Sequence, residues 1–195
     1  MNHRVTELHC IMPIANIPSV LEHGLLSHEQ ASRLPHADVS MAAVQERRDR
    51  IHVPGGLRLH QYVNLYFDAR NPMLFKRKHQ AESLCVLRIS RTVLNIAGVV
   101  ITEQNASSNY ARFYPSTALN CLNFDMIYAE DWRHPDDPIA YWQHKSMKCA
   151  EVLVPNAMPC DYIDGAYVVN EAAKTCLSDA GFTGPVEINP RLFFR

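Results

Sequence analysis

Apolar runs of strand length recur along the chain, and most of them are rich in β-branched or aromatic side chains. They lie at residues 8–14, 62–67, 84–89, 98–101, 151–154 and 166–169. Runs of this length and composition, bounded by turn-forming residues, predict β-strands. The middle of the chain is therefore expected to be rich in β-structure.

Helix signals lie before and after these runs. Residues 16–24 begin with a capping type of side chain at Asn16, carry Pro18 in the first turn and end at a His-Gly stop. Further capped helices are predicted at residues 40–48, 138–148 and 170–177. This order of elements predicts an α+β fold in which helices flank a central, mostly antiparallel β-sheet.

The composition indicates one globular domain over residues 1–195, because 195 residues with 47% hydrophobic content can bury one substantial core. The sequence contains neither an apolar signal core at its N-terminus nor the roughly 20-residue apolar stretch of a membrane helix. We therefore expect a soluble, cytoplasmic protein without membrane contact. Its six cysteines, which form no Cys-x-x-Cys pair, are expected to be reduced and mostly buried.

Charge is nearly balanced, and the formal net charge of -1 excludes a protein whose whole surface attracts nucleic acid. The cations are nevertheless unevenly placed, since a basic span occupies residues 47–78 and acidic residues gather at 125–137. Both a local nucleic-acid site and an ordinary solvated face are compatible with such a span.

Metal and Rossmann-type sites are not indicated. His134 and His144 have no partner at metal-ligand spacing, and Cys149 and Cys160 do not complete a zinc motif. No glycine-rich loop follows a strand in the manner of a dinucleotide-binding Rossmann domain. We expect no metal.

The most unusual string is Leu-His-Gln-Tyr-Val-Asn-Leu-Tyr-Phe at residues 59–67, followed by Asn-Pro-Met-Leu at 71–74. Composition alone favours a core strand and a turn there. The string also resembles a motif of the DarT toxins, which are DNA ADP-ribosyltransferases of toxin–antitoxin systems. Stretches similar to that family follow the same order and cover nearly the whole chain. They are residues 15–25, 45–48, 128–133, 136–138 and 150–154.

Two positions depart from the family pattern. Asn64 stands where a proline is usual, and Cys10 stands where many relatives have a histidine or another large residue. Because the first strand is expected to hold nicotinamide largely through backbone groups, the change at Cys10 alters the assignment little. His9 is expected to substitute in part.

The resemblance makes Glu151 the central catalytic residue and Arg47 the catalytic arginine, with Arg48 as the neighbour that a one-residue shift of the alignment selects. A fixed carboxylate suits the reaction, because loss of nicotinamide from NAD⁺ leaves oxocarbenium character on the ribose. In an alternating strand Glu151 shares a face with Leu153, so partial shielding of its carboxylate is expected. Without the resemblance, a solvated glutamate and a helix-terminal arginine facing water are the ordinary interpretations. We expect Glu151→Ala to abolish transfer and toxicity with only a small change in stability.

NAD⁺ is expected as the co-substrate. Its predicted contacts are His9, Cys10, Ile11, Met12, Asn16, Gly24, Leu26, Arg47, Arg48, Tyr62 and Tyr66. Nucleic-acid contacts are expected from the segment before Glu151, where aromatic, cationic and amide side chains suit stacking and edge reading of an unpaired base. These residues are Tyr110, Arg112, Phe113, Tyr114, Asn120 and Asn123. Phe113 and Tyr114 are equally compatible with the core.

Together these features predict transfer of ADP-ribose from NAD⁺ to a base in single-stranded DNA, because a base must lie outside a duplex to be modified. Residues 60–74 are closer to the thymidine-modifying branch of the family than to the guanosine-modifying one, so thymine is the expected target. The resemblance also implies a macrodomain antitoxin of the DarG type, and we expect the toxin to be a monomer. Transfer to guanine, RNA or protein and a non-catalytic nucleic-acid-binding module are the alternatives.

Overall fold

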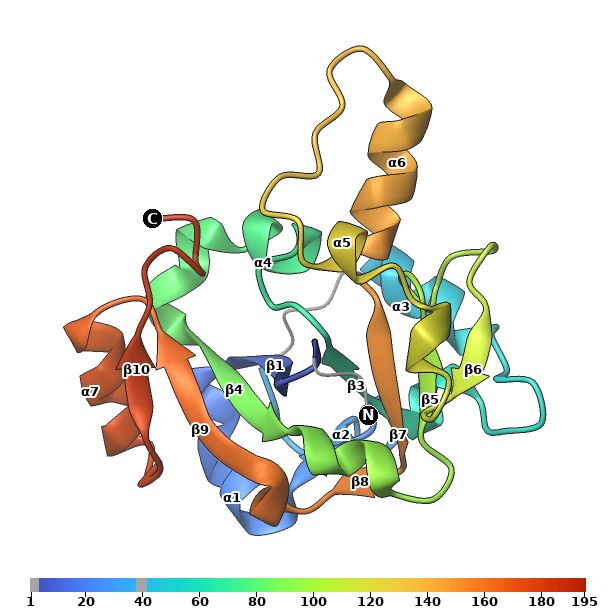
Figure 1. Ribbon diagram of the computed structural model, residues 1–195. Helices are drawn as coiled ribbons and strands as arrows, with labels where there is room; N and C mark the ends of the chain where they lie inside the picture. The colour runs from blue at the N-terminus through green and yellow to red at the C-terminus, as the bar shows by residue number, and fades with distance from the viewer. Residues whose placement is uncertain (1–3, 38–41) are drawn as a thin grey trace.

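Eight strands form one mixed sheet at the centre of the molecule (Figure 1). The computed structural model describes residues 4–37 and 42–195. The strands are β1 (Glu7–Pro13), β3 (Tyr62–Tyr66), β4 (Leu84–Ser90), β5 (Val100–Thr102), β6 (Phe113–Pro115), β7 (Glu151–Pro155), β9 (Ile163–Val168) and β10 (Val186–Ile188). Their order is β10-β9-β4-β1-β3-β7-β5-β6. Every neighbouring pair is antiparallel except β9 and β10, so the predicted mostly antiparallel sheet is confirmed.

The strand predictions differ from the structure mainly at the ends of the sheet. All six predicted runs overlap a strand, but the run at 98–101 does so only at its last two residues, because Gly98 turns the chain with φ +80°. The sequence did not indicate β6 or β10, each only three residues long. It also missed β2 (Leu25–Leu26) and β8 (Ala157–Met158), which pair in a separate two-stranded sheet.

Four predicted helices are present, namely α1 (Ile17–His23), α3 (Ala42–Asp49), α6 (Pro138–Met147) and α7 (Glu171–Asp179). Asp137 and Asn170 cap α6 and α7 by accepting hydrogen bonds from Ala140 and Ala173. The predicted side-chain cap at Asn16 is wrong, because its amide instead bonds the backbone of Ala37. The first two residues of the predicted helix at 40–48 lie outside the described part of the chain.

The remaining helical segments are short. They are α2 (His28–Ala31), α4 (Pro72–Lys76), α5 (Phe124–Ile127), and the 3-10 turns η1 (Ile14–Asn16), η2 (Leu59–Gln61), η3 (Lys78–Ser83), η4 (Arg91–Asn95), η5 (Leu119–Cys121) and η6 (Cys160–Tyr162). Within the described ranges, no helix is long and apolar enough to cross a membrane.

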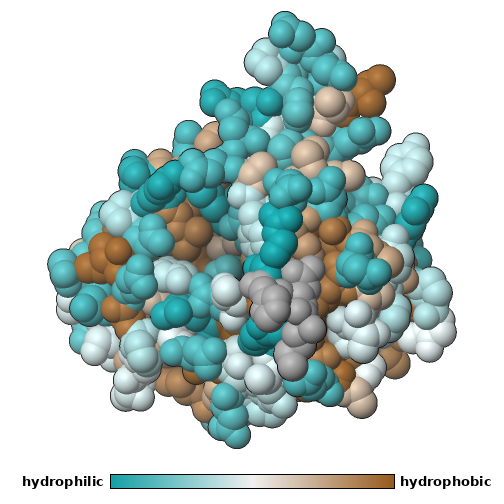
Figure 2. All heavy atoms as spheres, in the orientation of Figure 1, coloured by the Kyte–Doolittle hydropathy of each residue, from teal (hydrophilic) through white to brown (hydrophobic). Residues whose placement is uncertain are grey.

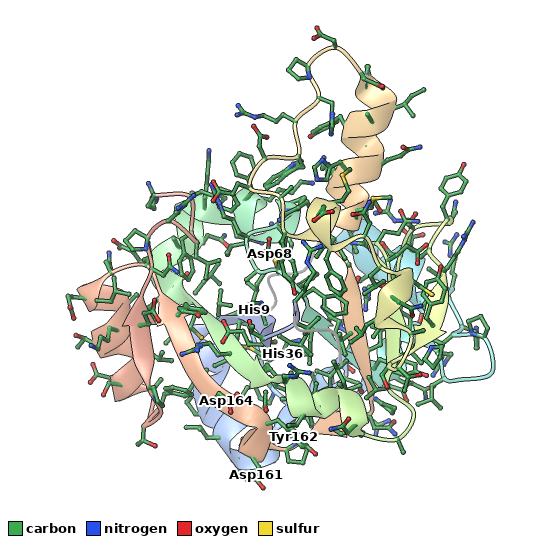
Figure 3. The ribbon with its side chains drawn as sticks, viewed as in Figure 1. His9, His36, Asp68, Asp161, Tyr162 and Asp164 are labelled. Carbon is green, nitrogen blue, oxygen red and sulfur yellow. The ribbon has the colours of Figure 1, made fainter. Side chains whose placement is uncertain are left out.

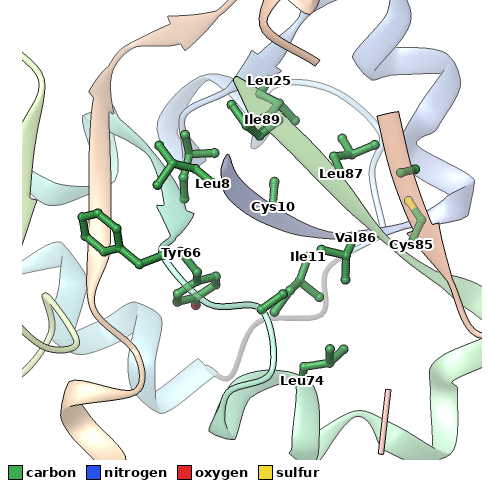
Figure 4. Packing of buried hydrophobic residues seen from close by; sticks show 14 of the residues in the cluster. Leu8, Cys10, Ile11, Leu25, Tyr66, Leu74, Cys85, Val86, Leu87 and Ile89 are labelled. Carbon is green, nitrogen blue, oxygen red and sulfur yellow. The ribbon is translucent and has the colours of Figure 1, made fainter. Parts of the chain in front are cut away.

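The main core surrounds β1 and β4, where Leu8, Leu87 and Ile89 are fully buried (Figure 4). Helix α7 packs beside β9, β4 and β10 at one end of the sheet. All six cysteines are free thiols, as predicted, but only three of them are buried. Cys121 and Cys176 are exposed, so the prediction of mostly buried thiols holds for half of the set.

The segment of residues 103–150, here called the β5–β7 connection, joins two neighbouring strands of the sheet and contains β6, α5 and α6. Helix α6 projects from the body of the molecule (Figure 1). The two ends of the connection meet, since the Asn105 amide donates to the Ser146 carbonyl at 3.0 Å. At its far end Lys148 is fully buried and bonds both Asp68 and the Ile127 carbonyl.

Candidate active site

A cleft of about 1320 Å³ lies against β1 and β3 and is bordered by α3, α4 and the β5–β7 connection. Its lining combines apolar side chains with cations and amides, which is typical of sites for large polar ligands. The surrounding surface is mostly hydrophilic, with apolar side chains scattered among polar ones (Figure 2).

Glu151 is the first residue of β7 and lies opposite Tyr66 of β3. Its side chain is 0% exposed, so the shielding that the strand pattern indicated is complete. The Ala106 amide donates to Oε1 at 3.0 Å, and the Glu151 amide donates to Thr102 Oγ1 at 3.1 Å. The start of the β5–β7 connection thus holds the carboxylate, and Thr102 of β5 holds the backbone of the same residue.

Arg48, rather than Arg47, contacts this carboxylate. Its Nη1 atom lies 3.1 Å from Glu151 Oε1 and 2.9 Å from Oε2, and Arg48 is only 6% exposed. Arg47 is exposed and lines the cleft. Consecutive residues of a helix point about 100° apart, which explains why these neighbours have different surroundings. A catalytic role for Arg47 stays a prediction, while the ion pair belongs to Arg48.

Tyr66 adds a second buried polar group beside the pair. Burial raises its pKa well above the ordinary value, and the Glu151 carboxylate and Cys149 raise it further. Its phenol therefore stays protonated and can donate a hydrogen bond within the cleft that it lines.

Nine of the eleven residues predicted to contact NAD⁺ line the cleft. They are Cys10, Ile11, Met12, Asn16, Leu26, Arg47, Arg48, Tyr62 and Tyr66. His9 is not among the lining residues; its ring lies 3.2 Å from Glu7 and beside Tyr167 (Figure 3). Gly24 is also elsewhere, because it ends α1 with φ +77° against the Met158 carbonyl, where a Cβ would lie at 2.4 Å.

Three of the six residues predicted to contact nucleic acid line the cleft, and three do not. Tyr110, which is 84% exposed, lines the cleft together with Arg112 and Tyr114. Phe113 instead packs on a small apolar cluster that includes Val53, which favours the core alternative for it. Asn120 and Asn123 are exposed but do not line the cleft, and Asn123 caps α5 by accepting from the Met126 amide at 3.2 Å.

Sequence reasoning missed the contribution of α6 to the cleft. Ile139 and Trp142 line it while remaining 71% and 62% exposed. Lys145 lies on the same helix with Nζ 4.4 Å from the centre of the Trp142 ring. The available signal was the pair of large apolar residues Ile139 and Trp142, whose i, i+3 spacing places both on one face of the helix.

His134 and His144 are brought together although their spacing gave no ligand signal. His134 Nε2 is 2.9 Å from His144 Nδ1, and His144 Nε2 is 3.0 Å from the Met126 carbonyl. Burial lowers the pKa of His144, so a neutral ring that bridges these two groups is consistent with its position. Within residues 4–37 and 42–195, no three His, Cys, Asp or Glu side chains gather in a group that could hold a metal ion.

Comparison with known proteins assigns this chain to a family. A family model described as ssDNA thymidine ADP-ribosyltransferase, DarT, matches residues 9–194. The chain belongs to the DarT family. The predicted resemblance is therefore confirmed, and with it the fold class, because solved DarT structures superpose on nearly all of the chain.

Two relatives and three structures illustrate the similarity to other DarT proteins. A DNA ADP-ribosyl transferase from Thermus sp. (strain 2.9) is 31% identical over 85% of this chain and 82% of its own length. A DNA ADP-ribosyl transferase–DNA ADP-ribosyl glycohydrolase fusion protein from Thermosipho africanus is 29% identical over 98% of this chain. The chain spans only half of that fusion protein.

The structure of Thermus sp. 2.9 DarT in complex with ADP-ribosylated ssDNA has a TM-score of 0.80 and 28% identity, and the match covers 96% of both chains. Thermosipho africanus DarTG in complex with ADP-ribose has a TM-score of 0.84 and 28% identity, covering 96% of this chain and 51% of that one. Thermus sp. 2.9 DarT has also been solved with NAD⁺, with a TM-score of 0.76 and 25% identity.

Proposed function

We propose that this chain transfers ADP-ribose from NAD⁺ to a thymine base of single-stranded DNA. The observation that carries the proposal is the buried Arg48–Glu151 pair beside a large cleft in a member of the DarT family. The solved complexes of Thermus sp. 2.9 DarT with NAD⁺ and with ADP-ribosylated ssDNA support the same pair of substrates here.

Glu151 stabilises the positive charge that develops on the ribose. The bond between the ribose and nicotinamide breaks, nicotinamide leaves as a neutral molecule, and the ribose carbon gains oxocarbenium character. A fixed carboxylate that accepts a hydrogen bond from the 2″-hydroxyl opposes this charge. A ring nitrogen of the base then bonds to the ribose carbon as its N–H bond breaks, and the proton passes to the solvent.

The hydrogen bonds of the carboxylate leave one of its oxygens able to accept a further bond, although the side chain is 0% exposed and Glu151 is not among the residues that line the cleft. Oε1 already accepts from Arg48 and from the Ala106 amide, whereas Oε2 accepts from Arg48 alone. An ionised carboxylate has about two acceptor positions on each oxygen. Oε2 therefore keeps one acceptor position, which we assign to the ribose hydroxyl.

The β5–β7 connection provides the surface for the DNA. Tyr110 and Trp142 are exposed aromatic residues that line the cleft, and Arg112 and Lys145 add positive charge near them. Stacking on aromatic rings combined with cationic contacts to phosphates is how proteins bind single strands. A single strand can cross this surface with one base turned toward the ribose.

Two further features of the proposed function rest on the relatives. Thymine is supported by the description of the matching family model. A toxin role, countered by a macrodomain antitoxin of the DarG type that removes the adduct, is supported by the fusion of transferase and glycohydrolase in the Thermosipho protein. Guanine, RNA and protein acceptors remain the alternatives to be tested.

The test is incubation of the purified chain with NAD⁺ labelled in its adenylate part and with four acceptors. These are single-stranded oligonucleotides with and without thymine, the matching RNA, and casein. We expect label only on the thymine-containing DNA, and none with Glu151→Gln. Label on the thymine-free DNA, on RNA or on casein alone would overturn the proposed target.

A further inference from the structure

We propose that His60 is a positioning residue that sets the rotation of α3 and thereby directs Arg48 toward Glu151. The inference rests on the proposed function only in treating the Arg48–Glu151 pair as part of the machinery. His60 belongs to the string at residues 59–67, but nothing in the function described above uses it.

Helix α3 has almost no apolar anchor of its own. It reads Ala-Ala-Val-Gln-Glu-Arg-Arg-Asp, and Val44 is only partly buried. Arg48 is the one buried side chain among residues 43–49. A helix without an apolar stripe gains no preferred rotation from hydrophobic burial, so polar contacts must fix which side faces the cleft.

His60 makes such contacts one helical turn apart. Its Nε2 lies 3.0 Å from Gln45 Oε1, and its Nδ1 lies 3.3 Å from Asp49 Oδ1. Gln45, Arg48 and Asp49 are spaced i, i+3, i+4 and therefore lie on one face of α3. A hydrogen bond from His60 to this face consequently favours the rotation that keeps Arg48 on the side of the helix that faces Glu151.

The imidazole is itself fixed to the sheet. It is 13% exposed, and its ring packs against that of His28 with centroids 4.4 Å apart. The preceding Leu59 is fully buried and donates its amide to the Ile51 carbonyl at 2.8 Å, and β3 begins two residues after His60. His60 therefore links the position of β3 to a helix that also contacts the sheet through the Arg48–Glu151 pair.

The protonation state of the His60 ring is consistent with this role. Burial, His28 and Arg48 lower the pKa of His60, while Asp49 raises it without reversing the shift. A neutral ring carries one N–H and can therefore donate either from Nε2 to Gln45 Oε1 or from Nδ1 to Asp49 Oδ1, but not to both at once. The contact with Asp49, whose side chain is 64% exposed, is secondary.

The test compares His60→Leu, which keeps bulk and removes the donor, with His60→Gln, which restores an N–H at similar reach. The exposed His79 provides the control His79→Leu. Nicotinamide release is followed with and without thymine-containing DNA. We expect His60→Leu to lower kcat about tenfold with a smaller change in the KM for NAD⁺, and His60→Gln to recover most of it.

A double-mutant cycle separates positioning from general destabilisation. If His60 acts through Arg48, His60→Leu should cause no further loss in an Arg48→Lys background, whereas independent effects multiply. Equal loss in His60→Leu and His60→Gln, or an undiminished effect of His60→Leu in the Arg48→Lys background, would overturn the inference. Gln45→Leu, which removes the acceptor instead, is expected to reproduce the loss if His60→Leu fails to fold.

Hydrogen exchange gives a readout that does not depend on transfer. Amides of residues 43–49 should exchange about tenfold faster in His60→Leu than in the unsubstituted chain, and at the original rate in His79→Leu. Unchanged exchange in α3 contradicts the positioning role even if the protein modifies another acceptor. Conversely, faster exchange in a chain that labels no DNA contradicts the proposed function alone.

Discussion

The Arg48–Glu151 pair is the main polar contact inside the protein next to the cleft. Removing two charges from water is costly, and an ion pair buried this deeply contributes little net stability compared with a well-packed apolar pair. The pair instead orients the carboxylate before the substrate arrives, which lowers the reorganisation needed in the transition state.

Glu151→Gln should remove transfer and also weaken the fold. We expect kcat to fall at least about 10²-fold, because the fixed negative charge is lost. The buried Arg48 loses its counter-charge, so the free energy of unfolding should fall by about 3 kcal/mol. Replacement of Glu151 was predicted from sequence to change stability little; its complete burial in an ion pair revises that prediction.

Labelled-NAD⁺ assays and urea denaturation check both effects of Glu151→Gln. Asp179→Asn, at the exposed end of α7, is the matched control and should behave like the unsubstituted chain. An inactive Glu151→Gln protein of unchanged stability would show that the Arg48 contact is absent in solution.

The two neighbouring arginines should respond differently to substitution. Arg48→Lys replaces a planar fork with a compact ammonium, and we expect kcat to fall about tenfold with a loss of about 1–2 kcal/mol in stability. Arg47→Ala should raise the KM for NAD⁺ while changing stability by less than about 0.5 kcal/mol, because its side chain is exposed. Equal kinetic and stability effects at the two positions would contradict the separation of roles.

At the scale of elements, a buried lysine joins the segment after β3 to the segment before β7. Lys148 bonds the Asp68 carboxylate and the Ile127 carbonyl. Lys148 is fully buried and the Asp68 side chain is 18% exposed. Asp68→Asn leaves the ammonium without its counter-charge, and we expect about 3 kcal/mol of destabilisation in urea denaturation. Adding Lys148→Met should recover part of that loss, whereas additive losses would argue against a direct pair.

A second ion cluster ties β1, β4 and β9 together at Glu7. Burial alone would raise the pKa of Glu7, but hydrogen bonds from His9, Arg88 and Tyr167 outweigh it and lower the pKa to about 2. The stabilisation is therefore fully present above the ordinary glutamate pKa of about 4.5 and is lost as the pH falls toward 2.

Glu7→Gln should consequently be less stable than the unsubstituted chain by about 2 kcal/mol at pH 7. The difference should shrink between pH 4.5 and 2, where the native carboxylate takes up its proton. Thermal unfolding across this pH range measures it. A difference that is constant with pH would mean that packing, rather than charge, accounts for the effect.

Elements that carry their own end signals could be predicted from sequence, and those that depend on distant partners could not. The starts of α6 and α7 could be predicted from Asp137 and Asn170, because a capping side chain bonds backbone amides within the first turn of its own helix. Strands β6 and β10 are defined by their hydrogen bonds to β5 and β9, which are distant in sequence or not visible in it. Each is three residues long, which is too short to show an alternation of apolar and polar residues.

The site was predictable to the same extent. Family resemblance selected Glu151, but the choice between Arg47 and Arg48 depends on the rotation of α3, whose own sequence has no apolar side to fix it. Lys148 reads as a helix-terminal surface residue, and its burial follows from Asp68, 80 positions earlier. The sequence is equally compatible with Phe113 as a base-stacking residue and as a core residue. The structure favours the core, because Phe113 packs against the apolar cluster that includes Val53.

At the scale of the whole molecule, the two proposed substrates contact different parts of the chain. The predicted NAD⁺ contacts that line the cleft come from β1, η1, β2, α3 and β3, all before residue 67. The surface proposed for DNA comes from the β5–β7 connection. The nearly neutral net charge is compatible with this arrangement, because cations are needed only near the cleft.

The meeting of the two ends of the β5–β7 connection makes it an exchangeable unit in evolution. Since the Asn105 amide bonds the Ser146 carbonyl, the segment between them can change in length and composition with little effect on β5 and β7, provided that the Ala106 amide and the Ile127 carbonyl keep their bonds to Glu151 and Lys148. Grafting residues 106–145 from a relative that modifies another base should transfer that preference while leaving the KM for NAD⁺ within about twofold. A graft that folds but keeps the original preference would place base selection elsewhere. New targets could thus arise in such a lineage by recombination at a single loop, with the machinery that cleaves NAD⁺ inherited unchanged.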